Sequence, residues 1–524
     1  MSGFSLRLTT SAALGLAWAI AQSGVTIRTT TTLVQVGVAA RDAKGQPAEG
    51  LTKDDFEILD NGNAQSIAVF YGDTRAPAPP AAPSLPPGTF TNQIAANPSD
   101  RAGHSSIILL DWANTGFRNT ARAREQAREV VNRLSPSERI GVYSFDRFGL
   151  KVVNEIGSPR AAILDKLKTL IGQKSPCFQK QLDGLDDVYD DNMGSCGGNT
   201  VLAKDVVAFY VGQRTTETLL AFQSIAAHLA GVPGRKALIW ISSAFPLEIE
   251  TRAAGNGTFP DAIGAAQLYS GDVGRAMTKL NNADVSLYPV DARGLGSGFA
   301  DFATADDNTW PTMDYFAQRT GGVAYHGNNG IDVGIQTAIE DVQTGYTLGF
   351  YAAQASSRDG FHKLTVRSLR PGVTLRYKEG YYVDTPGKIG KTERQEAVNG
   401  AITALVDATA IPIEVKAARE KNTLTLRVSL RPDSLALVQK ADRWQGTVEF
   451  MTRFAKADGS QAAPPVARKI VLNLTQRTYD AAEHNGLLFS RTLDAPANAA
   501  SLRVLVRNDP SGEIGTLTIP MEGL

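Results

Sequence analysis

Three features are scarce in this chain of 524 residues. It has only two cysteines, which excludes a zinc ribbon or an iron–sulfur protein. It has no excess charge of either sign, because 53 Lys and Arg are matched by 53 Asp and Glu. Without net charge there is no long-range field to attract nucleic acid or anionic lipid, so we expect neither as a partner. After the first 21 residues, no apolar run is long enough to span a bilayer.

The first residues predict export. Arg7 precedes an apolar stretch at 11–21, which ends in the small-x-small pattern Ala19-Ile20-Ala21. This order is typical of a secretory signal peptide, so we expect cleavage near Ala21 and a secreted or periplasmic mature protein. The alternative is an N-terminal membrane anchor, for which an apolar run of about 11 residues is short.

The two cysteines would then lie in a compartment where disulfides persist. Cys177 and Cys196 bracket a Gly- and Asp-rich loop. Closing a loop of about 20 residues contributes roughly 3 kcal/mol, so we expect the disulfide; two free buried thiols are the alternative. Phe178 and Tyr189 in this loop are candidate contact residues, because loops on a rigid scaffold often carry recognition.

The remaining chain divides into stretches of different character. With 43% apolar residues it can bury real cores, and its length suggests about three domains. Period-two alternation broken by Asp/Asn-Gly turns predicts β-structure near the N-terminus, and strand-like segments separated by turns predict it again near the C-terminus. The predicted organisation is a signal peptide at 1–21, an Ig-like N-terminal β-domain at 22–71, a proline-rich linker at 72–103, an α/β domain at 104–345, a β extension at 346–385, and a C-terminal helix plus β-sandwich at 386–524.

The central stretch changes period. The apolar run 107–110 ends in Asp111, and an amphipathic helical pattern follows at 117–134. Further apolar runs and helical segments alternate as far as residue 345. Such alternation predicts a mostly parallel sheet with helices on both faces. The expected fold class is therefore a doubly wound, Rossmann-like α/β centre flanked by two β-domains.

Several motifs within residues 25–385 occur in an informative order. They are Asp-Phe-Glu-Ile-Leu-Asp-Asn-Gly at 55–62, Leu-Asp-Trp-Ala-Asn-Thr at 110–115, Pro-Gly-Arg-Lys at 233–236, Tyr-Pro-Val-Asp-Ala-Arg-Gly at 288–294, Thr-Gly-Gly at 320–322 and Tyr-Thr-Leu-Gly-Phe-Tyr at 346–351. Together they resemble a von Willebrand factor type A (VWFA) domain, and more narrowly the bacterial VWFA-related family described as acidobacterial. The resemblance implies binding of a protein ligand, or adhesion, at the carboxyl edge of the central sheet.

The same resemblance implies a degenerate metal-ion-dependent adhesion site. That site takes Asp-x-Ser-x-Ser after the first strand, a Thr from a second loop and a later Asp. Here Asp111 matches the first Asp, Thr115 stands for the second Ser, and Thr216 fits the Thr. Ala113 replaces the first Ser, and Ser243 stands where the last Asp belongs. Mg²⁺ or Mn²⁺ is the ion that these oxygens would hold. The alternative is that Asp111 caps the following helix.

Two functions stay open at this sheet edge. The first is protein binding, with Asn114 and Asp291 as further binding residues. The second is an extracytoplasmic hydrolase in which Asp111 and Asp291 act as general acid and base. No His-Glu-x-x-His motif and no Gly-x-Ser-x-Gly motif after a strand occurs, so we expect a binding protein and not an enzyme.

Overall fold

The computed structural model describes residues 32–72, 85–94, 104–115, 117–135, 138–171, 204–243, 260–293, 309–327, 330–352, 360–383, 390–509 and 511–524. The predicted signal peptide lies outside these ranges, as do Cys177, Cys196, Phe178 and Tyr189. Within the ranges, the strands form five sheets. No helix of the described chain is long and apolar enough to cross a membrane.

One sheet contains five strands in the order β10-β9-β6-β7-β8. Four of its strands are buried at every position, which explains their continuous apolar runs. Ile107 packs with α4, α5 and α7 on one face, and Ile108 packs with α1, α2 and α8 on the other. The elements are β6 (Ser105–Asp111), α1 (Phe117–Arg133), β7 (Ile140–Asp146), β8 (Gly149–Asn154), α2 (Arg160–Thr169), α4 (Lys204–Leu229), β9 (Lys236–Ser242), α5 (Pro260–Asn282), β10 (Val285–Asp291), α7 (Thr309–Thr320) and α8 (Ile331–Gln343).

The predicted fold class, a doubly wound and mostly parallel α/β core, is wrong. Among the described strands, parallel pairing is confined to β10 with β9, β9 with β6, and β6 with β7, and β8 joins this sheet in antiparallel orientation. In the other four sheets of the described chain, all strand pairs are antiparallel. An antiparallel pair needs only a short turn, whereas a parallel pair needs a crossover of about a dozen residues or more. Most of the described strands therefore come from the segments with period-two alternation and form antiparallel sheets.

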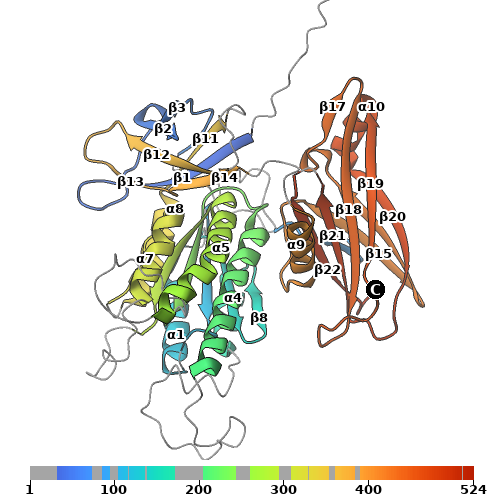
Figure 1. Ribbon diagram of the computed structural model, residues 1–524, viewed down its shortest axis with the longest axis horizontal. Helices are drawn as coiled ribbons and strands as arrows, with labels where there is room; N and C mark the ends of the chain where they lie inside the picture. The colour runs from blue at the N-terminus through green and yellow to red at the C-terminus, as the bar shows by residue number, and fades with distance from the viewer. Residues whose placement is uncertain are drawn as a thin grey trace, which may run out of the picture.

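The N-terminal β-domain combines two distant segments of the chain (Figure 1). Strand β1 pairs with β11 and places Val38 opposite Tyr346, while β2 pairs with β12. Asn61 and Gly62 join β2 to β3 with φ of 48° and 83°, the positive values that a tight hairpin turn requires. The elements are β1 (Thr32–Arg41), β2 (Phe56–Asp60), β3 (Asn63–Gln65), β4 (Val69–Tyr71), β11 (Tyr346–Ala352), β12 (Gly360–Ser368), β13 (Thr374–Arg376) and β14 (Gly380–Val383).

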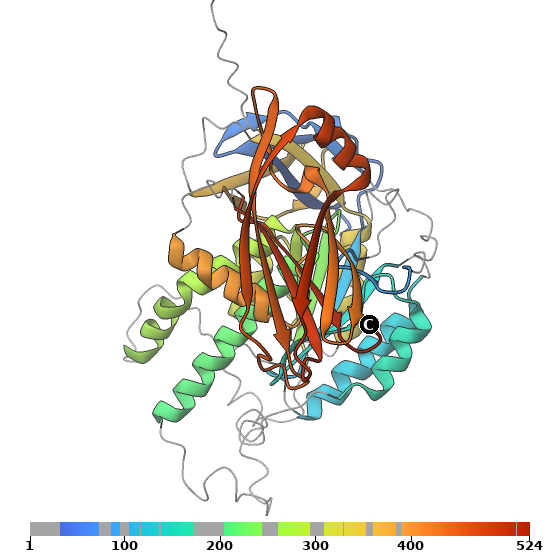
Figure 2. The same ribbon diagram turned by 90° about the vertical axis from the view of Figure 1, so that its right-hand side faces the viewer.

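The C-terminal region contains two antiparallel sheets, which stand in front of the rest of the molecule in Figure 2. Alternate residues of β16 are buried, and Val428 and Val504 belong to the core shared by the two sheets. Strand β5, which lies within the predicted linker, pairs with β15. The elements are β5 (Thr89–Thr91), α9 (Lys391–Thr403), β15 (Ile413–Glu420), β16 (Thr423–Leu430), β17 (Val438–Lys440), β18 (Arg443–Ala455), β19 (Val466–Thr475), α10 (Gln476–Asn485), β20 (Leu487–Asp494), β21 (Ser501–Asn508) and β22 (Ile514–Pro520).

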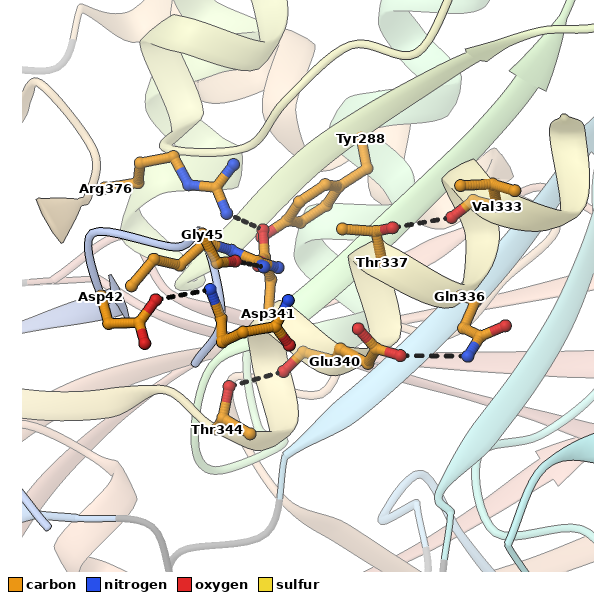
Figure 3. Close-up of polar contacts among 12 residues, drawn as sticks. Asp42, Gly45, Tyr288, Val333, Gln336, Thr337, Glu340, Asp341, Thr344 and Arg376 are labelled. Atoms are coloured by element: carbon orange, nitrogen blue, oxygen red, sulfur yellow. Dashed lines mark hydrogen bonds and ion pairs between the residues drawn. The ribbon is translucent and has the colours of Figure 1, made fainter. Parts of the chain in front are cut away.

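Two arginines dock the N-terminal β-domain onto helix α8. Arg41 ends β1, Arg376 ends β13, and both bind the carboxylate of Asp341, whose side chain is only 1% exposed. Figure 3 shows this carboxylate on α8 with Arg376 beside it. Because α8 packs on the mixed sheet, the three charges fix the β-domain on the helical layer.

A second contact lies at the amino ends of the parallel strands. Arg235 directly precedes β9, is fully buried, and donates to the carbonyl of Gly321 at 2.9 Å and to the hydroxyl of Tyr288 at 3.1 Å. Asp284 directly precedes β10 and accepts the N–H of Gly37 in β1 at 3.3 Å. The Pro-Gly-Arg-Lys motif thus places a buried cation where the β-domain meets the sheet.

Candidate functional site

The carboxyl ends of β6, β9 and β10 meet at one edge of the mixed sheet, because these strands run parallel. Asp111 ends β6, Ser242 ends β9, and Asp291 ends β10. All three are buried. The backbone N–H of Ala292 donates to the carbonyl of Ser242 at 2.9 Å, which continues the pairing just beyond the strands. We call this set of strand ends the carboxyl edge.

The carboxylate of Asp111 is fully buried and hydrogen-bonded through both oxygens. Its Oδ1 accepts the backbone N–H of Asn114 at 3.0 Å. Its Oδ2 accepts from Asn114 Nδ2 at 2.9 Å and from the indole Nε1 of Trp240 at 2.8 Å. Burial raises the pKa of Asp111 above its ordinary value, although these hydrogen bonds and one from Ser242 act in the opposite direction. Asp111 thus ties β9 to the turn that leads into α1.

The other predicted oxygen ligands divide into two groups. Thr115 and Ser243 lie together, since the Ser243 N–H donates to Thr115 Oγ1 at 3.2 Å. Thr216 lies apart: its side chain is exposed and donates to the carbonyl of Gly212 within α4. Thr218 takes the inward position instead, and its hydroxyl accepts from Asn114 Nδ2 at 2.9 Å.

The helical phase explains this difference. The sequence predicts a helix beginning at Thr218, whereas α4 begins at Lys204, so both threonines lie well inside it. Residues two apart on a helix are separated by about 200° around its axis, so Thr216 and Thr218 cannot face the same way. The structure therefore brings Asp111, Asn114 and Thr218 into contact and leaves Thr216 on the surface.

Arg214 of α4 supplies positive charge beside Asp111. Burial lowers the pKa of Arg214 to about 10, against the charges of Asp111 and Glu217, which raise it. A divalent cation would meet this guanidinium and would find both Asp111 oxygens engaged. Asn114 Oδ1 is one buried acceptor without a hydrogen-bond partner in the described chain. Nowhere in the described ranges do three His, Cys, Asp or Glu side chains form a metal-binding group. The residues present fit a divalent cation poorly.

Both carboxylate oxygens of Asp291 accept hydrogen bonds, as those of Asp111 do. Arg293 donates to it from Nε at 3.0 and 3.1 Å and from Nη2 at 2.8 Å, and Trp310 Nε1 donates at 2.8 Å. The Asp291 side chain is 1% exposed. A general base must reach the proton that it removes, and each oxygen of both carboxylates already accepts at least one hydrogen bond from the described residues. This geometry gives the hydrolase alternative no support.

Exposed aromatic residues flank the carboxyl edge. Trp310, at the β10 end, is 38% exposed and stacks on His326 with ring centroids 4.8 Å apart. Phe148, in the turn between β7 and β8, is 52% exposed, and the charged groups of Arg147 and Lys151 lie 4.5 and 5.2 Å from its ring centroid. Sequence reasoning missed these residues, because a single aromatic in a turn or at the start of a helix carries no periodic signal.

Comparisons with known proteins identify no family for this chain. No family model and no curated relative matches it. Among solved structures, the crystal structure of the TFIIH p34 N-terminal domain matches with 12% sequence identity, covering 46% of this chain and 98% of that one, at a TM-score of 0.21. At that TM-score the likeness carries no argument about fold or function.

Proposed function

We propose that this chain is an exported, non-catalytic protein that binds a protein partner with the carboxyl edge of its mixed sheet. The observation that carries the proposal is the pair of exposed aromatics, Trp310 and Phe148, at this edge. Trp and Phe are enriched at protein interfaces, because they bury a large area with little loss of conformational entropy. Arg293, which donates to Asp291, and Asn119, which donates to Ser243 at 3.2 Å, are partly exposed at this edge and suit the rim of such an interface.

The buried carboxylates have a supporting role in this proposal. Asp111 and Asp291 hold the turns that follow β6 and β10, and Trp310 is itself fixed by its bond to Asp291. A preordered aromatic loses less freedom when it binds, so the network contributes to affinity without touching the partner.

Binding is tested by recovering partners from the native envelope fraction with wild type and with the double variant Trp310→Ala/Phe148→Ala. Val471→Ala is the matched control, since Val471 is 74% exposed on β19 of the C-terminal region and belongs to a different sheet. A partner retained by wild type and by the control, but lost by the double variant, is the expected result. Equal recovery by all three proteins, or turnover of a small molecule by the pure protein, would contradict the proposal.

Export is a separate part of the proposal and has its own test. The apolar stretch before Gln22 supports it. Expression of the full chain with a C-terminal tag, followed by fractionation and N-terminal sequencing, should give a mature protein outside the cytoplasm that begins at Gln22. An intact Met1 in the cytoplasmic fraction would refute export.

A further inference from the structure

A cleft of about 790 Å³ lies between α7 and the N-terminal β-domain. One wall is formed by α7 and the segment 321–324 that follows it, and the other by parts of β12 and β13 and the chain after β13. This volume is within the range of known ligand sites, about 300–1,000 Å³. The lining includes neither Trp310 nor Phe148, so a ligand in this cleft is independent of the proposed function at the carboxyl edge.

Each wall of the cleft includes a segment at the edge of a β-sheet. Strand β13 is the outermost strand of its sheet within the described chain, and Leu375 and Arg376 line the cleft. On the opposite wall, Tyr325 extends the mixed sheet beyond β10, because its N–H donates to Pro289 and its carbonyl accepts from Asp291, both at 2.8 Å. Val323 and Ala324, just before Tyr325, line the cleft. An extended peptide is the ligand whose backbone pairs with such edges.

The lining of the cleft carries one more basic than acidic residue. Lys363, Arg319 and Arg376 line it, and the acidic residues in the lining are Asp314 and Glu379. Glu379 is paired with Arg319 at 2.9 Å, and Arg376 is paired with Asp341 of α8. Lys363 is the lining cation that forms no ion pair within the described chain.

More positive charge lies directly behind the wall. Arg235 is fully buried, donates to the carbonyl of the lining residue Gly321, and has no hydrogen-bond partner for Nε and Nη1 in the described chain. Lys378, between the lining residues Tyr377 and Glu379, is also buried. The carboxylate of Asp284 opposes these two cations, so the three groups together carry one excess positive charge behind the wall. Buried charges are weakly screened, so this excess favours an acidic ligand in the cleft.

We propose that this cleft binds an extended acidic peptide segment of a partner protein as an added strand beside β13. Alternate side chains of a strand point to opposite sides, so a peptide with acidic and apolar residues in alternation suits the site. Its acidic residues would face Lys363, and its apolar residues would contact Leu375 and the exposed Phe361.

The test is fluorescence anisotropy with labelled (Glu-Val)₃ added to the full mature chain. We expect saturable binding, no binding of (Lys-Val)₃, and loss of binding when alternate backbone nitrogens of the peptide are methylated. Lys363→Glu should weaken binding about tenfold, because an attraction becomes a repulsion near the surface. Lys440→Glu, a reversal at another exposed lysine on β17, is the matched control and should change nothing.

Four results would overturn the proposal. They are no binding of the acidic peptide, equal binding of its methylated form, equal effects of the two lysine variants, and competition by free glutamate or inorganic phosphate at the same concentration as the peptide. The last result would show a small-anion site in place of a peptide site. Unchanged melting temperatures establish that both variants are folded.

Discussion

Trp240 donates its indole N–H to the carboxylate of Asp111 across two neighbouring parallel strands, at 2.8 Å. Both side chains are fully buried. The bond occupies an oxygen that a metal ion would need, and it joins β9 to the turn after β6. The carboxyl edge is therefore held together by hydrogen-bond donors of the protein itself.

Metal binding at the carboxyl edge can be tested directly. Because the Asp111 oxygens are engaged and Arg214 adds positive charge beside them, we expect millimolar Mg²⁺ or Mn²⁺ to leave the melting temperature unchanged. Differential scanning fluorimetry with and without each ion measures this. A rise in wild type that disappears in Asp111→Ala would instead establish the metal site with Thr115 and Ser243 as its other candidate ligands.

The two threonines of α4 should differ in their effect on stability. Thr218→Ala removes a buried acceptor from Asn114 and should cost about 1 kcal/mol of unfolding free energy. Thr216→Ala changes an exposed side chain and should stay within about 0.5 kcal/mol. Urea denaturation measures both values. Equal costs would contradict the assignment of the inward position to Thr218.

The contact between α4 and the C-terminal region should weaken as pH rises. Burial lowers the pKa of His228. Three effects raise it: the hydrogen bond to Glu155 at 3.3 Å, the charge of Glu155 and the hydrogen bond to the backbone carbonyl of Asp407. They outweigh burial, so the pKa of His228 is raised above 6.5. Protonated His228 therefore stabilises the folded protein fully below about pH 6.5, and this stabilisation is lost as the pH rises through the folded-state pKa of His228.

Melting temperatures measured between pH 5.5 and 8.5 test this sign. His228→Gln should flatten the fall, whereas His484→Gln, at an exposed histidine of α10, should not. Identical pH profiles for wild type and His228→Gln would rule out His228 as the titrating group.

Asp341 should be essential for docking the N-terminal β-domain. Asp341→Ala leaves Arg41 and Arg376 without their shared carboxylate and should destabilise the protein by about 3 kcal/mol. Glu340→Ala is the control: Glu340 is the next residue of α8, and Gln336 donates to its carboxylate on the exposed surface. Limited proteolysis should release the β-domain faster in the first variant. Similar proteolysis of both would show that apolar packing holds the domain.

Gly321 should tolerate no side chain. Its φ is +78°, and a Cβ would lie 2.5 Å from the carbonyl carbon of Tyr377. Gly372 has a similar φ of +76° but open space around it, so Gly372→Ala reports the backbone strain alone, about 1 kcal/mol. We expect Gly321→Ala to cost about 3 kcal/mol because the steric overlap is added. Equal losses of unfolding free energy would mean that the Tyr377 segment moves away freely.

Local structure was predictable wherever a periodic pattern or a turn signal carried it. The amphipathic pattern at 117–134 corresponds to α1, Phe117–Arg133, and the Asn61-Gly62 pair forms the hairpin turn between β2 and β3. The fold class was not predictable in this way. Strand alternation says which residues can be buried, but it does not say that β1 pairs with β11 or that β8 runs antiparallel to β7.

The residues of the candidate site were also only partly predictable from the sequence. Sequence reasoning placed Asp111, Thr115 and Ser243 near one sheet edge, because all three follow apolar runs. It could not assign the inward position to Thr218 over Thr216, since that depends on where α4 begins. It also could not foresee that Arg214 and Trp240 would surround Asp111, because neither stands at a characteristic spacing from it.

The sequence by itself determined the periods of the strands and helices, the tight turns, the neutral overall charge and the apolar N-terminal stretch, since each depends on residues close together in the chain. Only the tertiary structure decided which strands pair, which side chains engage the buried carboxylates, and where cations gather behind the cleft. The physical reason is that pairing, burial and electrostatic coupling act between residues brought together by packing, at separations along the chain that no local pattern records.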